Sequence, residues 1–115
     1  MTDRLIMVFS LLVVLTGCAS NQGLYEWGQY QETLFVVYHE PELKEEALKG
    51  YLEFVETGGT PQYPIAPGLY AEAGTFMLEQ GEVDSAIKYY KMEYEAWPES
   101  QPMLGMLIEN LEARK

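Results

Sequence analysis

The sequence has very few of the residues on which most enzyme and metal chemistry depends. Its 115 residues include one cysteine, Cys18, and one histidine, His39. A single cysteine excludes an internal disulfide and a CxxC site, and one histidine among scattered glutamates makes a poor transition-metal site. We therefore predict no metal, no cofactor and no catalytic residue, and we interpret His39 as a residue at the end of a helix.

Positive charge is also scarce, because seven Lys and Arg residues stand against 18 Asp and Glu, a formal net charge of -11 at pH 7. Such a surface repels nucleic acid and anionic lipid headgroups. Glu45 with Glu46 and Glu93 with Glu95 could be imagined as catalytic carboxylate pairs. Residues one or two positions apart on a helix point in different directions, so we expect a solvated acidic face instead.

The most specific motif lies near the N-terminus. Residues 5–15 are almost wholly apolar, yet too few for a bilayer, which needs about 20, so they fit a secretory signal. Residues 15–18, Leu-Thr-Gly-Cys, resemble the bacterial lipobox. The resemblance implies a thioether-linked lipid on Cys18, cleavage before it and acylation of the new amine, which together give a firm membrane anchor. A plain secretory signal or a core cysteine remains the alternative.

The position after the cysteine bears on the destination of the protein. Ala19 stands where inner-membrane retention would favour Asp. By resemblance to enterobacterial sorting, this implies the periplasmic face of the outer membrane. We thus expect a signal peptide at residues 1–17, a lipidated linker at 18–23 and a helical domain at 24–115, with residues 21–28 leading from the lipid to the domain.

Apolar residues in that domain recur at helical spacing. Residues 33–38 also suit a strand by propensity, but the helical sequence that follows favours a helix. Pro41 is predicted to open the next helix and Gly58-Gly59 to end it. Ser100 is predicted to cap the last helix. Helices are expected over residues 24–38, 41–57, 68–80, 83–97 and from 101 onwards.

One segment has the length and pattern of a tetratricopeptide repeat (TPR). Residues 67–100 span 34 positions, and residues of the expected types stand at the consensus places. They are Tyr70, Ala73, Gly74, Met77, Gly81, Glu82, Val83, Ala86, Tyr90 and Pro98. Glu93 departs from the pattern, because a small residue is expected there. Residues 24–57 are repeat-like, so the predicted fold is all-α, with TPR-like stacked hairpins and about five helices.

The whole mature chain also resembles a family of small bacterial lipoproteins. The resemblance rests on Gly-Leu-Tyr-Glu-Trp-Gly-Gln-Tyr at residues 23–30, Pro-Gly-Leu-Tyr-Ala-Glu at 67–72 and Trp-Pro-Glu-Ser at 97–100. Members of that family tend to be encoded beside a CsgG-like lipoprotein. The resemblance implies a shared envelope complex with such a partner.

These features favour a non-enzymatic interaction or assembly module over an enzyme. Tyr25, Trp27 and Tyr30 would form a docking patch near the membrane, or else pack as core under the first hairpin. Tyr89 would face a groove. The alternatives are an accessory regulator of a cell-wall (peptidoglycan) enzyme and a binding protein for a small cationic ligand.

Overall fold

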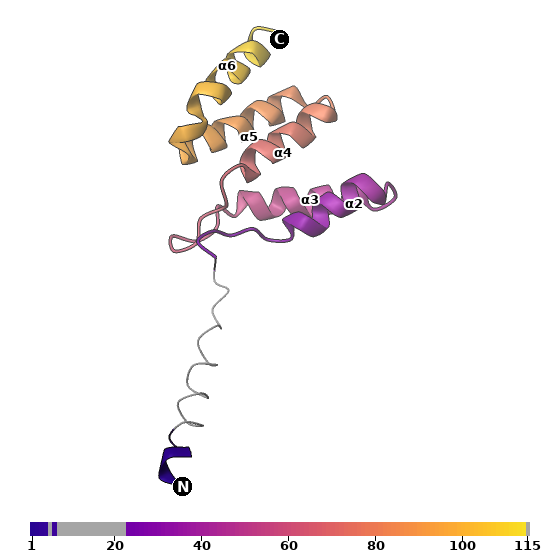
Figure 1. Ribbon diagram of the computed structural model, residues 1–115. Helices are drawn as coiled ribbons and strands as arrows, with labels where there is room; N and C mark the ends of the chain where they lie inside the picture. The colour runs from indigo at the N-terminus through magenta and orange to yellow at the C-terminus, as the bar shows by residue number, and fades with distance from the viewer. Residues whose placement is uncertain (5, 7–22, 115) are drawn as a thin grey trace.

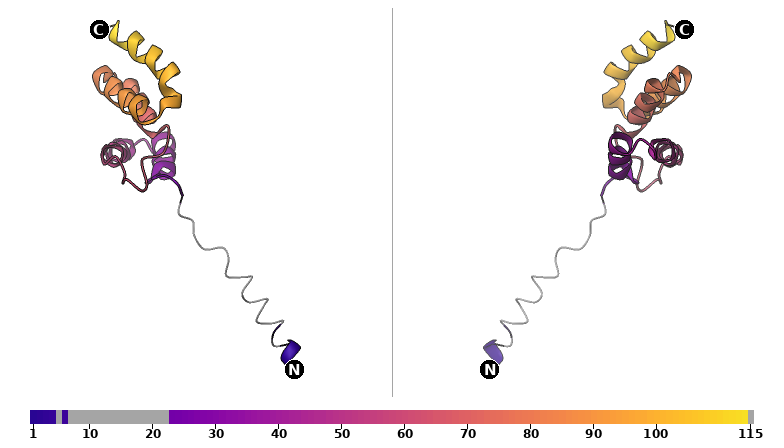
Figure 2. Two further views of the ribbon diagram at one scale, coloured as in Figure 1. Left: turned by 90° about the vertical axis from the view of Figure 1, so that its left-hand side faces the viewer. Right: turned by 90° about the vertical axis from the view of Figure 1, so that its right-hand side faces the viewer.

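The computed structural model describes residues 1–4, 6 and 23–114, so the lipobox with Cys18 lies outside the described residues. The all-α prediction is confirmed. The helices are α2 (Tyr30–His39), α3 (Lys44–Glu56), α4 (Leu69–Glu79), α5 (Val83–Ala96), the short 3₁₀ helix η1 (Pro98–Ser100) and α6 (Gln101–Glu112). Figures 1 and 2 show them stacked as two hairpins, α2–α3 and α4–α5, followed by α6.

The second hairpin is closed by small residues. Gly74 on α4 is buried against α5, where an added Cβ would lie 2.7 Å from the Tyr90 ring and 3.1 Å from the Ala86 carbonyl oxygen. Ala86 itself is fully buried. Because neither residue keeps the backbones apart, α4 and α5 pack more closely than α2 and α3. The small residues expected at these two positions therefore lie at the contact of the two helices.

The first helix of the domain begins later than predicted. α2 starts at Tyr30 rather than Leu24, because the preceding residues pair with the proline-rich loop at 60–67. The Glu26 N–H donates to the Pro64 carbonyl at 2.8 Å, and the Ala66 N–H donates to the Glu26 carbonyl at 2.9 Å. The expectation that residues 21–28 are only a linker is therefore wrong at Glu26, which belongs to the domain.

The start of α3 and the capping of α6 also differ from expectation. Pro41 does not open α3, which begins at Lys44 after a turn. Ser100 precedes α6 as predicted, but its side chain makes no capping hydrogen bond, because η1 leads directly into the helix. The predicted stop at Gly58-Gly59 is confirmed: both residues follow the end of α3 with positive φ angles of 73° and 70°, which glycine adopts without strain.

The buried face of α2 also differs from the apolar pattern. Phe35 and Tyr38 are 56% and 66% exposed. The residues of α2 that are buried are Thr33 and Val37. The helical spacing of the apolar residues therefore does not identify the buried face of α2. The core is continuous from Val37 through Tyr51, Phe76 and Tyr90 to Leu104.

Candidate functional site

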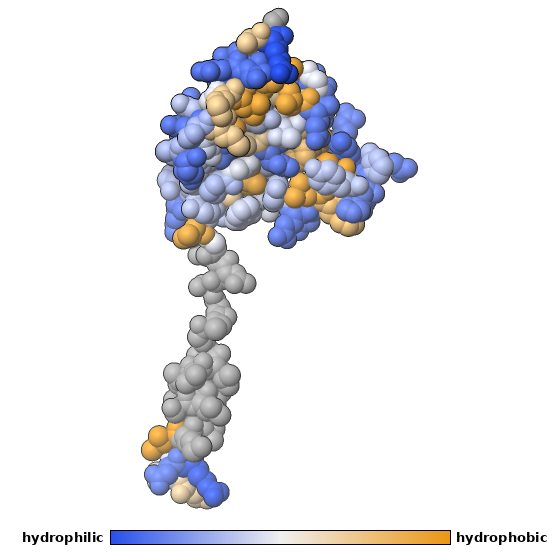
Figure 3. Space-filling view, turned by 45° about the horizontal axis from the view of Figure 1, so that its top comes forward, coloured by the Kyte–Doolittle hydropathy of each residue, from blue (hydrophilic) through white to orange (hydrophobic). Residues whose placement is uncertain are grey.

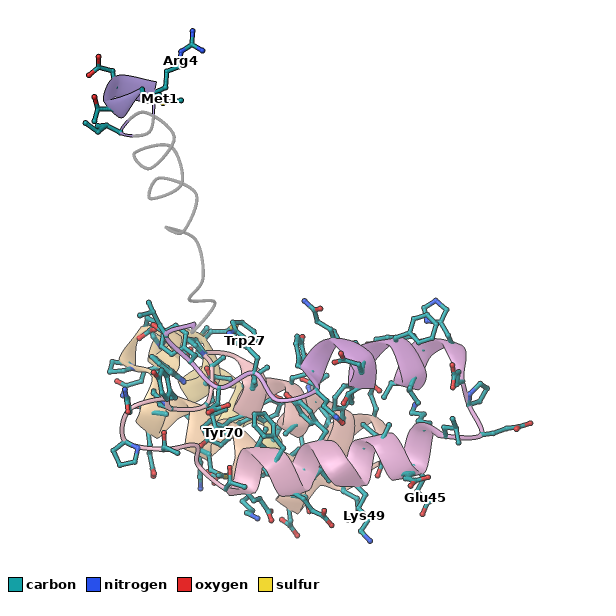
Figure 4. All side chains as sticks on the ribbon, turned by 90° about the horizontal axis from the view of Figure 1, so that it is seen from below. Met1, Arg4, Trp27, Glu45, Lys49 and Tyr70 are labelled. Atoms are coloured by element: carbon teal, nitrogen blue, oxygen red, sulfur yellow. The ribbon has the colours of Figure 1, made fainter. Side chains whose placement is uncertain are left out.

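The three aromatic residues predicted as a docking patch occupy different environments. Tyr25 is half-buried, and its ring meets Trp97 edge-to-face with the ring centroids 5.4 Å apart. Tyr30 is also half-buried and lies 6.1 Å from the Tyr51 ring. Trp27 is 48% exposed, near the start of α2 (Figure 4). Only Trp27 of the three offers a large free surface, and a docking role for them remains a prediction.

Tyr89, the fourth predicted contact residue, joins the two hairpins. It is only 4% exposed, and its hydroxyl donates to Glu56 Oε1 on α3 at 2.7 Å. Lys88 Nζ donates to the same oxygen at 2.6 Å. These two hydrogen bonds lower the pKa of Glu56, with that from Lys88 contributing more, while burial chiefly raises the pKa of Tyr89. The Tyr89 hydroxyl is therefore already hydrogen-bonded within the chain.

Glu93 is a polar side chain whose burial the sequence pattern did not predict. The expectation of a solvated acidic face is wrong here, because Glu93 is 1% exposed. Its Oε1 accepts a 2.6 Å hydrogen bond from the Gly68 N–H, at the start of α4. Unpaired amides and the helix dipole both favour a carboxylate at that place. Glu93 on α5 therefore caps α4 from a neighbouring helix.

The electrostatics of this cap combine opposing effects. Burial raises the pKa of Glu93, whereas the backbone amides of Gly68, Ala71 and Tyr70 lower it, and the net direction is upward. Among the described residues, Glu93 Oε2 and Trp97 Nε1 are the buried side-chain atoms without a hydrogen-bond partner. Glu93 thus fills the place of the expected small residue and stabilises the junction between loop 60–67 and α4 through a cap.

His39 lies at the end of α2, as predicted. Its ring stacks on Phe35, with the centroids 4.6 Å apart, and its Nδ1 lies 3.0 Å from the Phe35 carbonyl oxygen. No group of three or more His, Cys, Asp or Glu side chains that could hold a metal ion occurs within residues 1–4, 6 and 23–114. In that same part of the chain, no helix has the length and apolarity needed to cross a membrane.

An open cleft of about 470 Å³ lies between α2 and α3. It is bordered by Gly28, by Gln29, Glu32, Thr33 and Val36 from the α2 side, and by Glu46, Ala47, Gly50, Tyr51 and Phe54 from α3. The α2–α3 cleft contains none of the four predicted aromatic residues. Figure 4 views α2 and α3 from this end of the stack, with Glu45 and Lys49 on the side of α3 that faces away from α2.

Large apolar side chains are exposed at both ends of the stack. Phe35, Tyr38 and Leu43 are exposed on or beside α2, and Met103 and Met106 are 63% and 70% exposed on α6. Figure 3 shows hydrophobic areas separated by a mostly hydrophilic surface, one of them at the end that carries α6. Phe35 stacks on His39, and the surface that these side chains leave exposed is available to another molecule.

The comparisons with known proteins identify a domain family. The family model described as "Domain of unknown function (DUF4810)" matches residues 24–107, which include every helix up to the middle of α6. The searches of curated proteins and of solved structures gave no significant match.

Proposed function

The chain belongs to the DUF4810 family, and we propose that it is a lipid-anchored, non-enzymatic interaction module of an envelope complex. The observation that carries this proposal is the pair of exposed apolar ends. In stacked helical repeats the terminal units normally present polar outer faces, yet here Phe35, Tyr38, Met103 and Met106 are all more than half exposed. Exposed apolar patches of this kind mark contact surfaces.

The hairpin geometry supports a relationship to TPR domains. Residues 67–100 have the repeat length, and Gly74 meets Ala86 where the consensus requires small residues. α6, which packs against α5, would then act as a cap on this hairpin. In such stacks, a binding surface forms along the hairpins and holds a segment of a partner.

The place of action follows from the lipobox resemblance. Lipidation of Cys18 and the Ala19 beside it would put the domain on the periplasmic face of the outer membrane, where a CsgG-like lipoprotein is the suspected partner. We expect the wild-type chain to incorporate labelled palmitate and fractionate with the outer membrane, and the Cys18→Ser chain to do neither. Equal palmitate labelling of both chains would contradict the anchor.

The interaction itself is tested by crosslinking in intact cells, followed by purification of the chain from detergent-solubilised membranes. We expect an envelope protein, with a CsgG-like lipoprotein as the first candidate, to be enriched with the wild type. The enrichment should fall when Phe35, Tyr38, Met103 and Met106 are replaced by Lys. Replacing the exposed Gln31 and Glu109 by Lys is the control. Recovery of no envelope protein with the wild type would overturn the proposal.

The same purification separates the alternative function. An accessory regulator of a cell-wall enzyme would recover a peptidoglycan synthase or hydrolase, and the net charge of -11 suits a basic enzyme surface. Binding that weakens steeply with salt would favour this alternative. Enrichment of a CsgG-like lipoprotein that tolerates salt would favour the assembly role.

A further inference from the structure

We propose that the α2–α3 cleft binds a partner helix that carries Lys or Arg on either side of a small apolar patch. This inference deepens the proposed function by naming the chemistry of the partner. It rests on three features of the cleft: a floor of small side chains, two exposed carboxylates on opposite walls, and a position close in sequence to the predicted anchor.

The floor of the cleft is shallowly open because it is lined by small side chains, of which Gly50 is exposed. Thr33 on α2 faces Ala47 and Gly50 on α3. A Cβ added at Gly50 would meet no atom within 4 Å, so nothing in the described chain requires a glycine there. Gly28 is different, because a Cβ there would lie 2.8 Å from the Phe54 ring. A glycine inside a helix destabilises it by about 1 kcal/mol relative to alanine, so Gly50 keeps space open at a cost to stability.

The walls carry charge of one sign. Glu32 on α2 and Glu46 on α3 are both exposed. Each is in the first turn of its helix, and because one is on α2 and the other on α3, they stand on opposite walls of the cleft. The ion pairs found in the described chain are Lys88–Glu56 and Lys91–Glu112, neither of which involves the cleft. No Lys or Arg lines it.

This arrangement selects among possible occupants. A second copy of the chain would bring a further net charge of -11 to an acidic cleft, and an anionic lipid surface would be repelled in the same way. A cationic side chain gains an opposite charge at each wall, and an aliphatic side chain between two cations covers the floor. Charge complementarity therefore favours a basic, amphipathic protein segment.

The dimensions specify the spacing of that segment. From Gln29 to Val36 along α2, the cleft extends seven residues, or about 10 Å at 1.5 Å per residue. On a partner helix the same distance separates residues i and i+7, with i+3 and i+4 on the same face between them. The expected motif has Lys or Arg at i and i+7 and aliphatic residues at i+3 and i+4.

The partner is expected close to the membrane. Gly28 borders the cleft and stands ten residues after Cys18, so with the proposed lipidation the cleft is at most about 36 Å from the anchored residue. A helix adjoining the membrane-embedded part of an envelope protein, or following its own lipid anchor, lies within that reach.

The test uses the full chain purified from membranes in detergent and a fluorescent 18-residue helical peptide with Lys at i and i+7 and Leu at i+3 and i+4. A control peptide of the same composition carries the two Lys residues on the opposite face. Fluorescence anisotropy should show saturable binding of the first peptide and at least about tenfold weaker binding of the second, the loss expected when a central contact is removed.

Variants of the chain then locate the binding. Gly50→Leu fills the floor and should lower affinity by at least about tenfold while leaving the fold intact, because leucine is the better helix former. Glu32→Gln and Glu46→Gln should each lower it by about two- to fivefold at low salt, as for exposed ion pairs. The matched control is Glu45→Gln, in the same first turn of α3 as Glu46 but outside the cleft. Unchanged affinity in Gly50→Leu, or equal binding of both peptides, would overturn the proposal.

A photo-crosslinking amino acid at residue 50, and separately at residue 106, distinguishes this proposal from the general one in the native envelope. A crosslink from residue 50 to a segment with the basic spacing supports the cleft. A crosslink from 50 to lipid, to a second copy or to an acidic segment overturns it. A crosslink to an envelope protein from 106 alone leaves the interaction module standing and overturns the cleft, whereas no protein crosslink from either position counts against both.

Discussion

Two identical substitutions in this domain should change its stability in opposite directions. Gly50 and Gly74 both lie inside helices, where Gly→Ala removes backbone freedom from the unfolded chain and stabilises by about 0.8–1.0 kcal/mol. At Gly50 a Cβ meets nothing within 4 Å, so this gain should appear in full. At about 4–8 °C per kcal/mol for a domain of this size, Gly50→Ala should raise Tm by several degrees.

Gly74→Ala meets a different environment. The new Cβ would lie 2.7 Å from a ring carbon of Tyr90 and 3.1 Å from the Ala86 carbonyl oxygen. The ring is 3% exposed and its hydroxyl lies 3.1 Å from Thr75 Oγ1, so it has little room to move. Overpacking of this kind costs about 1–3 kcal/mol. Offset by the helix gain, the net loss is about 0–2 kcal/mol, and the gap between the two variants equals the overpacking cost of about 1–3 kcal/mol.

Urea unfolding of residues 23–115, followed by circular dichroism, measures both variants against the wild type. The denaturant slope should stay constant, so that the midpoints report stability alone. Stabilisation by Gly74→Ala, or equal effects of both substitutions, would refute the packing assigned to the second hairpin.

Other predictions concern polar contacts. The raised pKa of Glu93 means that its contribution to stability is present below 4.5, its ordinary pKa, and lost as pH rises through the folded-state value. The stability advantage of wild type over Glu93→Gln, measured by urea unfolding, should therefore shrink with rising pH above 4.5, and a constant difference would contradict the burial. Tyr89→Phe should raise the pKa of Glu56 towards its ordinary value in an NMR titration, because a donor is lost; no movement would show that Lys88 alone sets it. Trp97→Phe should destabilise by about 1 kcal/mol or less, since Nε1 has no partner, and a loss near the 3–5 kcal/mol of a Trp→Ala change would reveal a hidden hydrogen bond.

Local sequence pattern predicted the helices that depend on near neighbours. α4 and α5 were placed to within one residue at each end, because Gly68, Gly81 and Pro98 mark their boundaries. The close contact at Gly74 and Ala86 followed from the repeat spacing. Each of these inferences needed only residues within one hairpin.

The misses at Glu93, at the start of α2 and at the cleft involve partners far away in sequence. Glu93 accepts a hydrogen bond from Gly68, 25 residues earlier, and no helical periodicity shows that a glutamate will be covered by another hairpin. The start of α2 depends on the pairing of Glu26 with residues 64–66. The sequence gives one indication of the α2–α3 cleft, which is Gly50 in the middle of a strong helix pattern. Whether that glycine leaves a cleft depends on the residues of α2 packed against it.

The α2–α3 hairpin lacks the close helix contact seen in the repeat at residues 67–100, and it contains the cleft. Both differences have the same physical cause. In α4–α5, Gly74 and Ala86 let the helices touch, and the Tyr90 ring fills the remaining space. The α2–α3 hairpin lacks that combination: its small residues, Thr33, Ala47 and Gly50, line an open cleft together with Tyr51 and Phe54, whose rings leave it unfilled. If the domain were selected only for stability, a larger residue at position 50 would fill this gap and strengthen α3 at once. The stack is therefore tightest in the second hairpin and most open in the first, which is the one closer to Cys18 in the sequence and the one that a partner at the proposed anchor would meet first.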